Sequence, residues 1–121
     1  MNFFDEIGGT PTIERIVRGF YVGVAEDEVL RPMYPADDLE PSIDHLTKFL
    51  AQYWGGPKTY QEERGHPRLR MRHADFRVDE DARDRWLAHF RVGLDEAGLT
   101  PEQDKQFWDY VTHAATFLIN A

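Results

Sequence analysis

Residues 64–76 read RGHPRLRMRHADF, and this short stretch is dense in arginine and histidine. The chain has 121 residues and a formal net charge of -8, so a basic cluster is unexpected in it. Guanidinium groups pair with carboxylates through parallel hydrogen bonds, and a neutral imidazole can bind a metal. The stretch therefore predicts an anion-binding surface that ends in one histidine, His73.

The composition of the chain excludes several classes of function. Asp and Glu number 22 against 14 Lys and Arg, which argues against nucleic acid as a partner, because phosphate-backbone binding needs a basic face. No cysteine is present, so histidine and carboxylate are the strong metal ligands that remain. The sequence shows neither a signal-peptide pattern nor the roughly 18 apolar residues of a membrane span. We expect one cytoplasmic domain over residues 1–121.

Hydrophobic periodicity predicts two helices before the basic stretch. Apolar residues recur at three- and four-residue steps over residues 11–25, and Thr10 is the expected cap of that helix. Residues 26–39 hold two prolines and several acids, and they predict short turns. The helical pattern resumes at Pro41 and stops at the glycine pair of residues 55–56.

The connection and the second half of the chain predict further helices. Residues 57–68 show no periodicity and predict an ordered loop, with a short helix over residues 69–74. Asp79 should cap a third long helix, which ends near Gly98. Thr100 opens a capping box, and the fourth helix runs from there to the C-terminus. With no convincing strand, the fold class is all-α, with four long helices and a long middle connection.

Apolar side chains alternate with the arginines of the basic stretch, among them Leu69, Met71 and Phe76. A ligand that is apolar in its middle, carboxylated at its edge and bound by imidazole would suit such a surface, and haem has these properties. The alternative is a solvated arginine-rich face, in which His73 is an ordinary capping histidine. The two alternatives stay open on the residues alone.

Several motifs, taken in order, resemble one family. They are Gly8-Gly9, Phe20-Tyr21, AEDEVLRPMYPADDL from Ala25, QYWGGPKTYQEERGHPRLRMRHADF from Gln52, and Trp86. The set covers nearly the whole chain and resembles the truncated haemoglobins of the second group. The resemblance implies a truncated globin-like fold, a two-over-two helical sandwich around haem b (iron protoporphyrin IX).

The resemblance also implies roles for individual residues. His73 would be the iron ligand, and Tyr21, Tyr34 and Trp86 would donate hydrogen bonds to a ligand on the distal side. The remaining distal pocket residues would be Phe20, Ser42, Leu46, Phe49 and Leu50. The haem propionates would meet Tyr60, Arg64, His66, Arg72 and His45, and the proximal pocket would contain Leu69 and Phe76.

Some of these residues also have a simpler interpretation. By pattern alone, Tyr21 and Trp86 lie on or beside inner helical stripes, where bulky aromatics are commonly core residues. Ser42 matches the position that gates the distal side, yet a serine is also an ordinary residue of a helix's first turn.

The resemblance implies a haem protein that binds oxygen, nitric oxide or carbon monoxide at a five-coordinate iron and releases oxygen slowly. Its redox use would be nitric oxide dioxygenation or peroxidase-like chemistry, and a chain of this size would depend on an external reductase. The alternative is oxygen storage, transport or sensing without turnover. A haem-free helical interaction domain is a third hypothesis, and a homodimer is left open.

Overall fold

The computed structural model describes residues 2–34, 37–65, 68, 71, 73 and 76–121. In these ranges the chain is helical and contains no strand, and none of their helices is long and apolar enough to cross a membrane. The elements in chain order are α1 (Phe3–Glu6), α2 (Gly9–Ala25), the 3-10 helix η1 (Arg31–Met33), α3 (Glu40–Tyr53), α4 (Thr59–Arg64), α6 (Glu80–Glu96) and α7 (Pro101–Phe117). The four predicted long helices are confirmed as α2, α3, α6 and α7.

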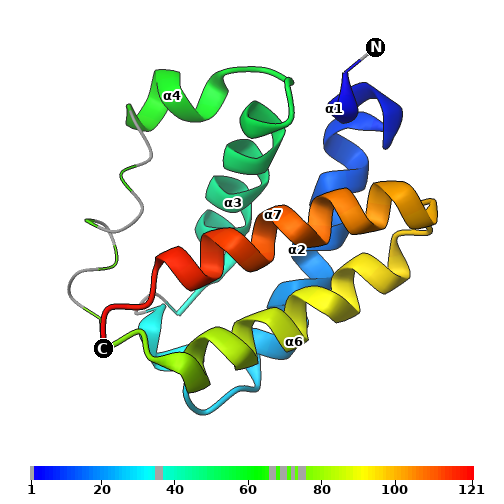
Figure 1. The fold of residues 1–121 in the computed structure, drawn as a ribbon. Coiled ribbons are helices and arrows are strands. Elements are labelled where there is room, and N and C mark those ends of the chain that lie inside the picture. The colour runs from blue at the N-terminus through cyan, green and yellow to red at the C-terminus, as the bar shows by residue number, and fades with distance from the viewer. Residues whose placement is uncertain (1, 35–36, 66–67, 69–70, 72, 74–75) are drawn as a thin grey trace.

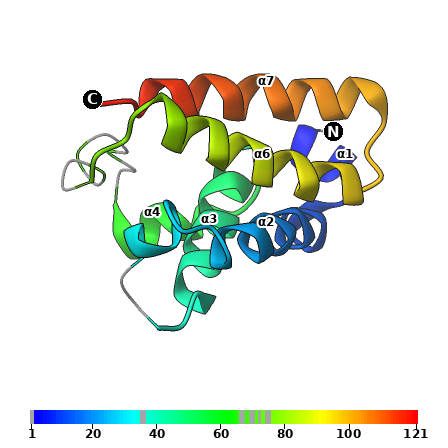
Figure 2. The ribbon, with the colours of Figure 1, turned by 90° about the horizontal axis from the view of Figure 1, so that it is seen from below.

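The four long helices pack as two layers of two (Figures 1 and 2). Helices α2 and α3 form one layer, and the antiparallel helices α6 and α7 form the other. The layers approach each other closely where α2 crosses α6, since a Cβ at Gly93 would collide with the carbonyl oxygen of Ile16. A side chain at this crossing would push the layers apart, so glycine is required there. The predicted all-α, two-over-two sandwich is confirmed.

A chain of aromatic rings forms the core between the layers. Phe20, Phe90 and Phe107 are fully buried and come from α2, α6 and α7. Phe90 lies 5.6 Å from Phe20 and 5.7 Å from Phe107, measured between ring centroids. Burying each ring contributes roughly 1.5–3 kcal/mol to folding. Aromatic packing therefore joins three of the four long helices.

Two predicted helix caps are confirmed, and one is wrong. The Asp79 carboxylate accepts from the backbone N–H of Ala82 at 2.9 Å, and Thr100 forms its capping box with Gln103. Helix α2, in contrast, begins at Gly9 with Gly8 as its N-cap, not with Thr10. Helix α1 ends at Glu6, and Gly8 turns the chain at once into α2, so Thr10 is already helical.

The prediction that residues 57–68 form a loop is wrong in part, because Thr59–Arg64 form helix α4. Contacts with α3 stabilise this short helix. The Lys48 ammonium lies 2.9 Å from the Glu63 carboxylate, and the Gln52 side chain accepts from the backbone N–H of Gln61 at 2.8 Å. Six residues are too few for a readable helical period. Most of the short helix predicted over residues 69–74 lies outside the described residues.

Candidate functional site

A cavity of about 440 Å³ lies among α2, α3, α4, α6, α7 and the segment that joins α4 to α6. Its volume falls in the range of small-molecule and cofactor sites, roughly 300–1,000 Å³. Most of the predicted site residues line it: Tyr21, Tyr34, Ser42, His45, Leu46, Phe49, Leu50, Tyr60, Arg64, His73, Phe76 and Trp86. Three others, His66, Leu69 and Arg72, lie outside the described residues.

Phe20 is placed differently from its prediction as a pocket residue. It is fully buried behind the cavity wall, with its ring centroid 4.8 Å from that of Tyr21 and 4.8 Å from that of Trp86. Successive residues of an α-helix point about 100° apart, so Tyr21 and Phe20 cannot share a direction. Phe20 therefore supports Tyr21 and Trp86 from behind.

Tyr34 is the centre of a hydrogen-bonded aromatic group. Its ring centroid lies 5.4 Å from that of Tyr21, and Tyr21 and Trp86 are placed as hydrogen-bond donors toward its hydroxyl, which lowers the pKa of Tyr34. The indole N–H of Trp86 can only donate, and a tyrosine oxygen can accept two hydrogen bonds. The proton of the Tyr34 hydroxyl is then left for another acceptor.

Burial keeps these tyrosines protonated. It is the largest influence on both phenols and raises the pKa of Tyr21 and of Tyr34 above the ordinary value of 10.0. Tyr21 is also hydrogen-bonded to Ser42 in the first turn of α3. Both phenols remain neutral donors near pH 7, which is the state that can stabilise a partly negative ligand.

The edge of the cavity toward α4 is suited to carboxylates. An Arg64 Nη1 lies 3.2 Å from Nε2 of His45, and the Arg64 guanidinium carbon lies 5.8 Å from the ring centroid of Tyr60. Burial and then the Arg64 charge lower the pKa of His45, so its imidazole is neutral at pH 7 and can accept from the guanidinium. Helix α4, missed by sequence reasoning, places both Tyr60 and Arg64 here.

The segment that carries His73 is fastened to the end of the chain. The backbone N–H and side-chain oxygen of Asn120 form two bonds with the backbone of Val78, both 2.8 Å long. The Asn120 amide nitrogen also donates to the carbonyl oxygens of Phe76, at 2.9 Å, and of His73, at 3.4 Å. Sequence reasoning missed Asn120, since no pattern marks an asparagine that bonds to a segment over 40 residues away.

Sequence reasoning also missed much of the cavity wall. The second half of α7 contributes Tyr110, Val111, Ala114 and Ala115, and its C-cap contributes Leu118. Hydrophobic periodicity does not mark such residues as a cavity wall, because a core and an apolar cavity demand the same side chains.

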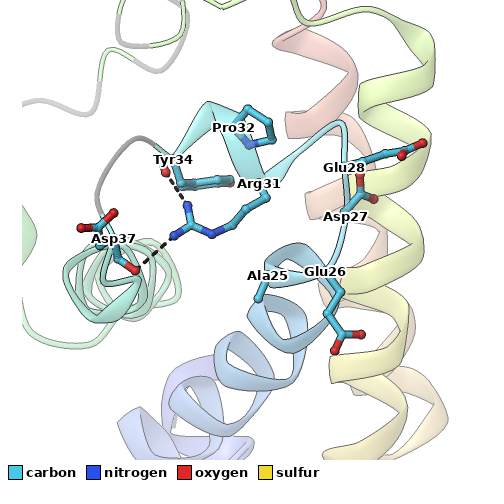
Figure 3. Close-up of a pocket in the computed structure, with 8 residues that line it drawn as sticks. All are labelled: Ala25, Glu26, Asp27, Glu28, Arg31, Pro32, Tyr34 and Asp37. Atoms are coloured by element: carbon cyan, nitrogen blue, oxygen red, sulfur yellow. Dashed lines mark hydrogen bonds between the residues drawn. The ribbon is translucent and has the colours of Figure 1, made fainter.

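A second, open depression of about 580 Å³ lies outside the turn between α2 and α3 (Figure 3). Tyr34 lines both this depression and the cavity, so the turn separates them. Arg31 donates to the carbonyl oxygen of Tyr34 and, at 3.2 Å, to that of Asp37, as the dashed lines in Figure 3 show. The side chain of Arg31 thus braces the turn on which Tyr34 lies.

The chemistry of the cavity fits haem. Its walls are mainly apolar, His73 supplies an imidazole that can ligate iron, and Arg64 supplies a cation at the edge for a propionate. The Tyr21, Tyr34 and Trp86 group adds polar donors inside the same cavity.

Comparison with known proteins places the chain in a family. Its residues 2–120 match the family described as bacterial-like globin. It is 34% identical over 112 residues to the group 2 truncated haemoglobin YjbI of Bacillus subtilis, which covers 93% of this chain and 84% of that protein.

Comparison with solved structures supports the same family. A thermostable haemoglobin from the actinobacterium Thermobifida fusca superposes with a TM-score of 0.98 at 50% identity, over 100% of this chain and 98% of the other. A truncated oxygen-avid haemoglobin from Bacillus subtilis superposes with a TM-score of 0.92 at 32% identity, over 99% of this chain and 100% of the other. The chain therefore belongs to the bacterial-like globin family, among its group II truncated haemoglobins.

Proposed function

We propose that this chain binds haem b in the 440 Å³ cavity, with His73 as the one protein ligand to iron. The observation that carries the proposal is that one cavity contains both His73 and the hydrogen-bonded group of Tyr21, Tyr34 and Trp86. When bound, haem supplies an iron that can take up oxygen, nitric oxide or carbon monoxide and can exchange electrons. The side chains around it then decide which of these uses is favoured.

The distal group holds a ligand that carries partial negative charge. Tyr34 donates its hydroxyl proton to that ligand, while Trp86 and Tyr21 donate to the Tyr34 oxygen and fix its direction. Donors placed before the ligand arrives stabilise charge without reorganising, most strongly where water is excluded. We infer slow release of oxygen from this arrangement.

The edge of the cavity seats the haem carboxylates. Arg64 pairs with a propionate, and Tyr60 and His45 lie beside it. We assign His66 and Arg72 to the same role, although both lie outside the described residues. These contacts select one orientation of the haem.

Ser42 is the residue we assign to the gate of the distal side. It lies in the first turn of α3, lines the cavity and is hydrogen-bonded to Tyr21. Its short side chain blocks little of the path from solvent. Gas entry is then controlled mainly by the aromatic group and not by a bulky gate.

The redox use that this arrangement favours is oxidation of nitric oxide or reduction of peroxide. The first reaction would form one nitrate from one oxygen and one nitric oxide, and each turnover would need one electron from an external reductase. Storage, transport or sensing of oxygen is the alternative, and it needs no electron donor. Slow release argues against transport.

Stopped-flow mixing of the oxygenated protein with nitric oxide tests the proposal. We expect the ferric spectrum to form within milliseconds, with one nitrate for each haem, and the ferrous form to return when a cytoplasmic extract supplies reductant. The carbon monoxide complex, which holds no oxygen, is the matched control and should yield no nitrate. Ferric protein that the extract does not reduce would favour storage or sensing over catalysis.

A further inference from the structure

We propose that Asp27 is a positioning residue that ties the turn carrying Tyr34 to the helix carrying Trp86, and so sets the geometry of the distal donors. The inference rests on the proposed function of the cavity. Asp27 does not line that cavity, and it lies on the turn beside α6 (Figure 3). Its role is therefore exerted through other residues.

The Asp27 carboxylate is buried and accepts bonds from both sides. Its side chain is 5% exposed. One oxygen accepts from the backbone N–H groups of Val29 and Leu30, at 2.9 and 3.0 Å, within its own turn. A buried carboxylate without such donors would strongly destabilise the fold. Asp27 therefore fixes the start of the turn that leads to Leu30 and Tyr34.

The other donors to Asp27 come from α6. Arg85 Nη1 lies 3.2 Å from one carboxylate oxygen, and His89 Nε2 lies 2.8 Å from the other. Residues four apart lie on one face of a helix, and Trp86 is the immediate neighbour of Arg85. The two bonds therefore hold the helix at the turn from which Trp86 reaches Tyr34.

The His89 imidazole is wedged among three elements. It faces Asp27 on the turn, belongs to α6, and lies directly on the backbone of α2, where a Cβ at Gly23 would collide with it. The ring is half-buried and bonded to the Asp27 carboxylate. The cluster of Asp27, Arg85 and His89 thus joins the three elements that carry Tyr21, Tyr34 and Trp86.

The charge of Asp27 is maintained by these contacts. Burial opposes ionisation, but the bonds from His89, Leu30 and Val29 and the Arg85 charge outweigh it and lower the pKa of Asp27 to about 2. The carboxylate is then negative at every physiological pH. The contacts between Asp27 and α6 therefore persist over the whole physiological pH range.

An ion pair between helices can also contribute stability alone, and the chain contains a control of that kind. Arg91 of α6 pairs with Asp104 of α7, and neither residue lines the cavity. Asp104→Asn removes one carboxylate that pairs with an arginine of α6, as Asp27→Asn does. The two variants therefore separate a general loss of stability from a change at the distal donors.

The experiment compares the haem-loaded parent with Asp27→Asn and Asp104→Asn. In Asp27→Asn we expect the Val29 and Leu30 amides to exchange several-fold faster, because the carboxylate oxygen that accepts both bonds becomes a neutral amide oxygen, which accepts more weakly. The C–O stretch of the carbon monoxide complex should move to higher frequency and oxygen should dissociate several-fold faster, because the Tyr34 hydroxyl is no longer held toward the ligand by Tyr21 and Trp86. Asp104→Asn should lower the thermal midpoint and leave the stretch unchanged.

Each remaining outcome has a defined meaning. An Asp27→Asn protein that loses stability but keeps the parent C–O stretch contradicts the positioning role. If Asp27→Asn does not fold, His89→Leu replaces it and should shift the C–O stretch. His89→Gln, which keeps an N–H donor, should show the stretch of the parent. If His89→Leu and His89→Gln show the same stretch, the proposal is overturned. If the unmodified protein takes up no haem, the proposed function of the cavity is contradicted instead. Amide exchange of Val29 and Leu30 needs no haem, so it still tests whether Asp27 holds its turn.

Discussion

Replacing Trp86 by Phe should speed the release of oxygen without preventing haem binding. The change removes the indole N–H that donates to Tyr34 and keeps an aromatic ring beside Phe90, whose centroid lies 5.1 Å from that of Trp86. One hydrogen bond contributes about 0.5–1.5 kcal/mol, which corresponds to a rate change of about 2- to 13-fold. Tyr21 still donates to Tyr34, so we expect the lower half of that range, about threefold.

The assay is stopped-flow displacement of oxygen by excess carbon monoxide, followed in the Soret band. Trp108→Phe is the matched control, because Trp108 is a half-buried tryptophan of α7 that packs under Arg91 and does not line the cavity. Its dissociation rate should equal that of the parent. If Trp86→Phe also releases oxygen within error of the parent rate, the indole has no part in holding the ligand, and the described network would not explain slow release.

Two further predictions concern the supports of the site. Asn120→Ala should lower stability by about 1 kcal/mol and speed haem loss to an apo-globin acceptor, because the His73 segment loses side-chain bonds to Val78 and Phe76; an unchanged loss rate would show that the C-terminal contact does not hold His73. Asp27 has a folded pKa of about 2, below its ordinary 3.8, so the stability it contributes is present above about pH 4 and is lost as pH falls toward 2. Asp27→Asn should flatten acid unfolding over that interval in urea titrations, and a parent-like slope would contradict it.

The long helices were predictable because their stripes and caps are local signals. Asp79 and Thr100 each bond a backbone group three residues ahead, so the pattern that predicts the cap contains all of the contact. Gly8 replaced Thr10 as the cap of α2 because the preceding turn, and not the local cap preference, decided where that helix begins. Boundaries set by neighbouring elements are not readable from a local window.

The candidate site divides in the same way. The resemblance to the family assigned four central site residues, because they lie in or near its motifs. The structure brings all four to one cavity: Tyr21, Tyr34, His73 and Trp86. Asn120 and Asp27 were not assigned, because their partners are 42 and 62 residues away in the sequence. Helix α4 depends on Lys48 and Gln52 of another helix, so its own six residues do not predict it.

The coordination state of the His73→Gly protein tests the account most directly. The parent, loaded with haem b, should show a Soret band and a ferrous spectrum typical of iron with one histidine ligand. His73→Gly should lose haem readily, and free imidazole should restore the parent spectrum by occupying the space left by the side chain. A variant that keeps the parent coordination without imidazole would contradict the assignment of His73 and, with it, the proposed orientation of the distal group.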